Sequence, residues 1–143
     1  MNVFPAISEL IPHTGQMVLL DRVTAFDDNS LSAELVVRPG LLVDDETVPS
    51  WVGIEYMAQT IGAYVGMKAR LAGEPIRLGF LLGTRRYGGN AAAFKVGAAL
   101  TVRVEKIMQD DRLGAFECRI LGEGIEISAN LNVYQPPLDD TQL

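Results

Sequence analysis

The sequence has very little of two side chains on which many protein sites depend, cysteine and histidine. Its 143 residues contain one of each, Cys118 and His13. One cysteine excludes an internal disulfide framework, and the two residues together supply too few ligands for a structural zinc site. We therefore expect no metal, and we expect Cys118, which lies in an alternating stretch, to be a small core residue.

Positive charge is also scarce, with 12 lysines and arginines against 18 acidic residues and a net charge of −6. Nucleic-acid binding needs a basic surface, so this class of partner is excluded. The first residues lack the basic and long apolar regions of a secretory signal. The apolar run 51–67 carries polar groups and glycines that suit a buried helix better than a membrane span. We therefore expect a cytoplasmic protein that binds neither membrane nor nucleic acid.

What is present is typical of one compact domain over residues 1–143, with 48% hydrophobic and 21% charged residues. A long helix is predicted from an N-cap at Ser50 to about Ala72, because Gly73 and Pro75 follow. Strands are predicted at 17–26, 30–38, 76–87, 99–108, 113–121 and 124–134. Two strands, one helix and four closely connected strands predict an α+β fold, in which an antiparallel sheet wraps around one central helix.

The predicted helix is apolar nearly all round, and one sheet covers only part of such a helix. Its glycines and alanines would let another segment approach the helix backbone closely. Exposed edge strands could pair with a second copy and extend the sheet. We therefore predict that the protein is a dimer.

Glu55 is a carboxylate on this apolar helix, and Gln59 lies one turn later on the same face. A buried carboxylate without a partner is costly, so it needs an explanation. In a structural interpretation, Glu55 pairs with Arg22 or Arg85 and fixes the core. In a functional interpretation, which we favour, Glu55 is a general acid or base in a dry cleft, where a perturbed pKa is useful.

Glu55, Ala58, Gln59 and Gly62 form the pattern Glu-x-x-Ala-Gln-x-x-Gly. This pattern resembles the central-helix signature of the hot-dog fold 3-hydroxyacyl-[acyl carrier protein] dehydratases. The segment IPHTGQMVLLDRV, residues 11–23, resembles the opening of the same enzymes. More narrowly, WVGIEYMAQ, GFLLGTRRY and FECRI are similar to segments of a divergent branch of predicted dehydratases. That branch is associated with gene clusters for aryl polyenes and related polyketide or fatty-acid products.

The resemblance implies a hot-dog dimer that converts an (R)-3-hydroxyacyl thioester to a trans-2-enoyl thioester. In these enzymes a histidine takes the C2 proton and a carboxylate protonates the departing hydroxyl. The carboxylate corresponds to Glu55, and Gln59 and Gly62 correspond to substrate-binding positions. No cofactor is expected, because the phosphopantetheine of acyl carrier protein or coenzyme A carries the substrate. Acyl carrier protein is the expected partner.

The chain departs from the family pattern at the standard histidine. Leu41 occupies that position, fourteen residues before Glu55. His13 is the one imidazole in the chain and is therefore the candidate base, although it could instead pack beside Pro12 and hydrogen-bond to the backbone. A further possibility is a heterodimer in which a related hot-dog protein brings the standard histidine.

Two other functions stay open on the sequence. Some hot-dog proteins are acyl thioesterases that use a carboxylate on the central helix, with no histidine. The chain could also be a non-catalytic subunit that binds acyl groups or acts as a scaffold. Arg85 and Arg86 end a predicted strand and are candidates to bind the carrier protein or the phosphopantetheine phosphate, because arginine suits phosphate geometry. A solvated surface is the alternative for these two arginines.

Overall fold

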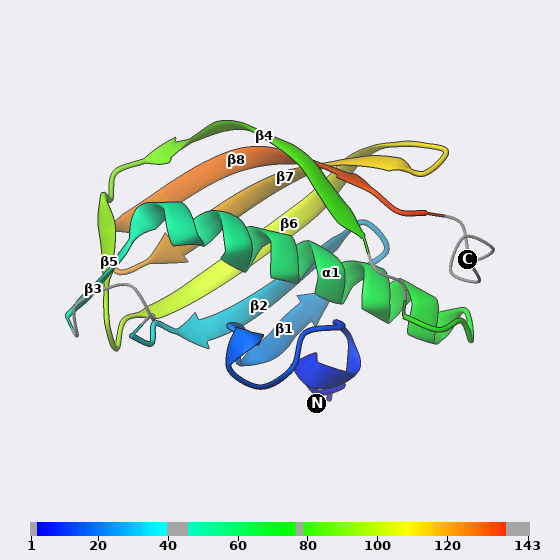
Figure 1. The fold of residues 1–143 in the computed structure, drawn as a ribbon, viewed down its shortest axis with the longest axis horizontal. Helices are drawn as coiled ribbons and strands as arrows, with labels where there is room; N and C mark the ends of the chain where they lie inside the picture. Colours follow the sequence, from blue (N-terminus) through cyan, green and yellow to red (C-terminus); the bar gives the residue numbers. More distant parts are fainter. Residues whose placement is uncertain (1–2, 40–45, 77–78, 137–143) are drawn as a thin grey trace.

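The computed structural model describes residues 3–39, 46–76 and 79–136 of the chain. Its elements are, in chain order, the 3₁₀ turns η1 (Ile7–Glu9) and η2 (Gly15–Met17), β1 (Arg22–Phe26), β2 (Ser30–Val36), β3 (Thr47–Pro49), the 3₁₀ turn η3 (Ser50–Val52), α1 (Gly53–Leu71), β4 (Phe80–Gly89), β5 (Ala93–Lys95), β6 (Ala99–Asp110), β7 (Leu113–Gly122) and β8 (Ile125–Tyr134). Six strands form one antiparallel sheet in the order β1-β2-β6-β7-β8-β4, and β3 pairs with β5 separately. The sheet curves around α1, which crosses its concave face (Figure 1). The predicted α+β architecture is therefore confirmed.

The start of α1 differs from the prediction. Ser50 is not the N-cap, because the 3₁₀ turn η3 precedes the helix and no side chain caps its first turn. Instead the backbone carbonyl of Ser50 accepts a hydrogen bond from the hydroxyl of Tyr87 on β4. A methyl group added at Gly53 would collide with that hydroxyl, so the glycine allows the strand to hold the start of the helix.

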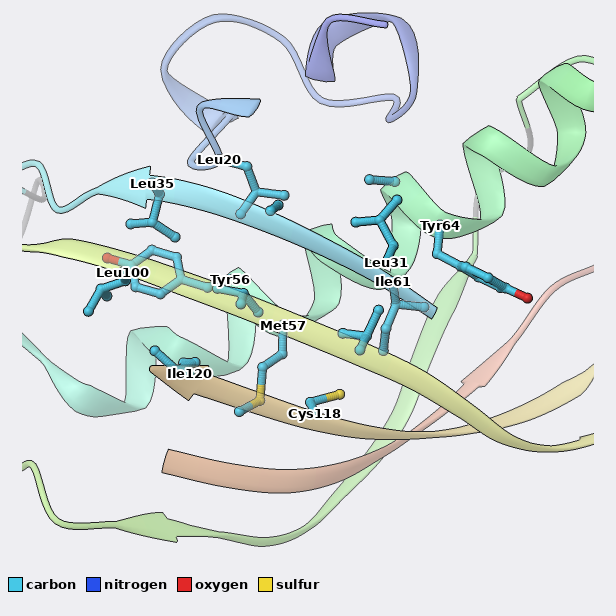
Figure 2. Packing of buried hydrophobic residues seen from close by; sticks show 14 of the residues in the cluster. Leu20, Leu31, Leu35, Tyr56, Met57, Ile61, Tyr64, Leu100, Cys118 and Ile120 are labelled. Atoms are coloured by element: carbon cyan, nitrogen blue, oxygen red, sulfur yellow. The ribbon is translucent and has the colours of Figure 1, made fainter. Parts of the chain in front are cut away.

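The core lies between α1 and the concave face of the sheet. Met57, Ile61 and Tyr64 of α1 are each at most 3% exposed, and they pack with inward residues of the strands that include Leu31 and Cys118 (Figure 2). Alternate residues of β7 are buried, as a strand with one face on a core requires. Cys118 is a fully buried free thiol, so its predicted core position is confirmed. Burial raises the pKa of this thiol to about 12.

The N-terminal segment packs on α1 as well. A side chain at Gly66 would collide with the backbone of Leu10, and one at Gly62 would come within 3.3 Å of the Ile11 side chain. These two glycines therefore admit a segment of the same chain, in line with the close approach to the helix that the sequence suggested. The predicted first strand, 17–26, is shortened to Arg22–Phe26, and its first residue, Met17, belongs to the turn η2.

No helix in the described part of the chain has both the length and the apolar character that crossing a membrane requires.

Candidate active site

A cavity of about 530 Å³ runs along one face of α1. This volume falls within the range of about 300–1,000 Å³ that is usual for small-molecule sites. Its lining residues on α1 recur every three or four positions, so they share one face of the helix. They include Glu55, Ala58, Gly62, Val65, Lys68 and Ala69. The facing wall comes from strands of the sheet, with Phe80 and Leu81 of β4, Lys106 and Gln109 of β6, Gly114 and Phe116 of β7, and Val133 and Tyr134 of β8.

His13 and Glu55 meet at this cavity. The His13 Nε2 atom lies 3.5 Å from the Glu55 Oε1 atom, and both side chains line the cavity. His13 reaches this place because the N-terminal segment crosses the helix, as Gly62 and Gly66 allow. The structure thus brings together the two residues for which the sequence suggested acid and base roles.

Glu55 is not buried as the sequence suggested, since 46% of its side chain is exposed. Its face of α1 lines the cavity and is not packed directly on the sheet. The structural interpretation of Glu55 is also wrong, because Arg22 pairs with Glu34 at 2.6 Å and Arg85 is an exposed residue of β4. The partners of Glu55 in the described residues are His13 and Gln59.

Gln59 is a buried neighbour of Glu55 and is only 1% exposed. Its amide nitrogen donates to the Met17 carbonyl at 2.6 Å and to the Glu55 Oε1 atom at 3.1 Å. Its amide oxygen accepts from the Leu19 backbone N–H at 2.9 Å. The amide is therefore engaged by protein groups, and these contacts hold the Glu55 carboxylate in place.

The second ring nitrogen of His13 has no hydrogen-bond partner in the described residues, although the atom is buried. Most catalytic histidines have one nitrogen held by a neighbour, which selects the tautomer and orients the ring. Among residues 3–39, 46–76 and 79–136 the Nδ1 atom of His13 has no such neighbour. An unsatisfied buried nitrogen of this kind costs about 1–3 kcal/mol, and a donor or acceptor from outside the described residues would remove that cost.

Residues 5–143 match the ApeP-like family, which is described as ApeP dehydratase. The chain belongs to this dehydratase family. The resemblance inferred from the two sequence motifs is therefore confirmed. No curated protein matches the sequence of this ApeP-like chain.

Solved structures agree with the assignment. The dehydratase heterocomplex ApeI:P from Xenorhabdus doucetiae is 31% identical, with a TM-score of 0.86, and the alignment covers 98% of this chain and 97% of the other. A hypothetical thioesterase from Streptococcus pneumoniae TIGR4, solved with coenzyme A, is 14% identical with a TM-score of 0.63, covering 80% of this chain and 84% of the other. The virulence protein Cj0977 from Campylobacter jejuni is 12% identical with a TM-score of 0.68, covering 96% and 91%. The last two likenesses show only that the hot-dog fold is shared.

The remaining predicted site residues of this ApeP-like dehydratase lie in different places. Gly62 lines the cavity beside the His13–Glu55 pair. Arg85 and Arg86 do not line it and are exposed on the edge strand β4. Arg86 has a φ of 58°, at a register shift between β4 and β8, and this irregularity precedes the half-buried Tyr87 that holds the start of α1. Leu41 lies outside the described residues.

Lys106 is a cavity residue that the sequence analysis missed. On β6 the buried positions Val102 and Val104 alternate with exposed ones, and Lys106 continues this inward series. Its neighbour across the sheet is the buried Phe116. The alternation alone could have revealed a lysine on the core face of the strand. The described residues contain no cluster of side chains that could hold a metal ion.

Proposed function

We propose that this chain removes water from an (R)-3-hydroxyacyl thioester on acyl carrier protein and leaves a trans-2-enoyl thioester. The observation that carries this proposal is the 3.5 Å approach of His13 to Glu55 at the wall of a cavity. Membership of the ApeP-like dehydratases supports the class of reaction. His13 acts as the base at C2 and Glu55 as the acid at the hydroxyl group.

The proposed reaction needs both groups at once. The C2 proton is weakly acidic and hydroxide is a poor leaving group, so a base and an acid must act on adjacent carbons. Two groups 3.5 Å apart reach adjacent carbons from the same side of the acyl chain. The Oε1 atom of Glu55 already faces His13 and accepts from Gln59. The Oε2 atom is therefore the oxygen available for the substrate hydroxyl.

A second hot-dog subunit is part of the proposal. The ApeI:P structure is a heterocomplex, and this chain is 31% identical to the chain it matches there. The edge strand β4 has one side that no described strand pairs with, and it carries Phe80, Leu81 and Leu82, which are 43–58% exposed. The buried Nδ1 atom of His13 also has no hydrogen-bond partner in the described residues. We therefore propose a heterodimer with a related hot-dog protein, and acyl carrier protein as the substrate-bearing partner.

The test is turnover of a 3-hydroxyacyl carrier-protein substrate, followed by mass spectrometry of the acyl group. Wild type, His13→Ala and Glu55→Gln are compared, each alone and co-purified with the related hot-dog subunit. Glu105→Gln is the matched control, because Glu105 is an exposed carboxylate on the sheet. We expect both site variants to lose water elimination and the control to retain it.

Three results would contradict parts of the proposal. Full activity of His13→Ala would remove His13 as the base. Full activity of the complex with Glu55→Gln would place the chemistry in the partner and make this chain a non-catalytic subunit. Release of free thiol without loss of water would assign thioesterase activity.

A further inference from the structure

The cavity extends far beyond the His13–Glu55 pair. On α1 its lining continues from Glu55 to Lys68, and thirteen residues of helix correspond to about 20 Å. The walls along this length are mostly apolar, with Ala58, Ile61, Gly62, Val65, Phe80, Phe116 and Val133. This apolar stretch suits a hydrocarbon chain. A pantetheine arm fits it less well, because two amide groups would lose hydrogen bonds to water there.

Polar and basic side chains close the far end of the cavity. Lys106 and Gln109 come from β6, Lys68 from α1, and Arg112 from the turn that joins β6 to β7. Glu74, which follows α1, also lines the cavity, so this end carries three cations and one carboxylate, although the whole chain has a net charge of −6. An apolar passage that ends in cations is suited to a ligand with an apolar body and an anionic end.

Lys106 is the most informative of these residues, because it points to the core side of β6 beside the buried Phe116. The Lys106 ammonium lies 5.9 Å from the centroid of the Tyr64 ring. That ring is held in place by its hydroxyl group, which donates to the Asp28 carbonyl at 2.6 Å, and by an edge contact with Phe116. The ammonium therefore has a defined position at the cavity wall.

The three cations at this end differ in their counter-ions. Lys68 is paired with Asp28 at 2.6 Å, and Arg112 lies 3.3 Å from Asp111. For Lys106, the described residues place no carboxylate within ion-pair distance, although its charge contributes to the lowered pKa of the Asp28 carboxyl. Lys106 is half-buried on the core side of its strand, so its ammonium can pair with an anionic group of a ligand in the cavity.

We propose that Lys106, with Arg112 and Gln109 lining the same cavity, binds an anionic oxygen group at the end of the acyl chain remote from the thioester. The preferred substrates would then be long acyl thioesters with an acidic terminus, and methyl-ended chains of equal length would be poorer. This inference rests on the proposed function for the position of the thioester, which it places at Glu55. It assigns Lys106 a role in substrate specificity.

The first test compares two series of 3-hydroxyacyl thioesters of increasing length, one ending in a carboxylate and the other in a methyl group. Both are offered as N-acetylcysteamine thioesters, which have no phosphate, to the full chain in the assembly in which it purifies. We expect the carboxylate series to be preferred by wild type at a length that spans the cavity. Lys106→Met should lower kcat/KM for those substrates about tenfold, the effect of losing one charge-assisted hydrogen bond. It should leave methyl-ended substrates unchanged.

Two variants serve as controls. Lys106→Arg keeps the charge and should keep most of the preference. Arg103→Met removes an exposed cation from the same strand, and it should not change the preference. Since Lys106→Met replaces a charged group on the core side by an apolar one, it is expected to fold at least as stably as wild type.

A second measurement does not depend on turnover. Binding of unreactive carboxylate-ended and methyl-ended acyl thioethers is measured with Glu55→Gln, by calorimetry. Preference for the carboxylate that disappears with Lys106→Met would support the inference even if no dehydration were found. Equal binding of both ligands would overturn it. So would an effect of Lys106→Met that appears only with coenzyme A or carrier-protein substrates, because the cationic end would then bind the phosphate.

Discussion

One face of α1 packs directly on the concave side of the sheet, and the adjoining face lines the cavity between the helix and the strands. On the first face, Met57 and Thr60 are fully buried. On the second, the side chain of Glu55 is 46% exposed, and Ala58 and Gly62 are only half-buried. The sheet therefore satisfies one face of the helix and leaves the other open to a ligand or a partner chain. Stability should depend mainly on the first face and chemistry on the second.

The largest expected effect is on the cavity face. Replacing Glu55 with Gln keeps the shape of the side chain and removes its acid function, so turnover should fall by about 10²–10⁴-fold. The melting temperature should stay close to that of wild type, because the side chain is half-exposed. Enzyme assays and thermal denaturation of the same preparation measure both quantities. A loss of stability comparable to the loss of activity would show that the two faces are not separate.

Met57→Ala tests the sheet face. This side chain is fully buried, and its removal leaves a cavity, so the free energy of unfolding should fall by about 2–5 kcal/mol. Turnover per folded molecule should remain near that of wild type at low temperature. Urea denaturation gives the first quantity and active-site titration the second. Inactive but fully folded protein would contradict the separation of roles.

Gln59→Leu tests the residue that joins the two faces. Loss of the Gln59 amide group leaves the Leu19 N–H and the Met17 carbonyl without their side-chain partner, and it removes one hydrogen bond to the Glu55 Oε1 atom. We expect stability to fall by about 1–3 kcal/mol, together with a smaller loss of activity than in Glu55→Gln. Thr60→Val is the matched control, because Thr60 is equally buried but bonds only to the Tyr56 carbonyl of its own helix. If the two variants were equally active, Gln59 would have no role in positioning Glu55.

The fold could be predicted because its signals are periodic and local. Alternation identified the strands, and the apolar run between a loop and Gly73 identified the helix. The ends of elements were less accurate because they depend on distant contacts. Ser50 looked like an N-cap, but Tyr87 from β4 uses its carbonyl. The short pair β3 and β5 was missed, since each strand has three residues and no measurable period.

The site was predictable in part for the same reason. Glu55 and Gln59 are one helical turn apart, so sequence spacing places them together. That His13 approaches Glu55 depends on how the N-terminal segment crosses α1, and only the motif resemblance suggested it. The orientation of Arg85 and Arg86 depends on a register shift in β4, which spacing does not reveal. The alternation of buried and exposed residues along β6 would have placed Lys106 on the core face of that strand.

The smallest expected effect concerns Lys68, the residue of the cavity face that is already paired. The Lys68 ammonium lowers the pKa of the Asp28 carboxyl below its usual 3.8, mainly through their hydrogen bond, and the same bond raises the pKa of Lys68 above its usual 10.5. A lowered acid pKa stabilises the fold above 3.8 and loses this effect as the pH falls through the folded value. A raised lysine pKa stabilises the fold below 10.5 and loses its effect as the pH rises through the folded value.

Asp28→Asn should therefore lower the melting temperature slightly at neutral pH, and the difference from wild type should vanish in strong acid and strong base. The effect stays small because the Asp28 side chain is 84% exposed and water screens the pair. Thermal denaturation across the pH range measures it, with Glu117→Gln as an exposed control. A difference that is constant with pH would show that the pair is not its source.

Asp28→Asn also frees the ammonium of Lys68 at the far end of the cavity. The preference for substrates with an acidic acyl end should therefore increase, and this result would separate a role of Lys68 in the cavity from a purely structural role.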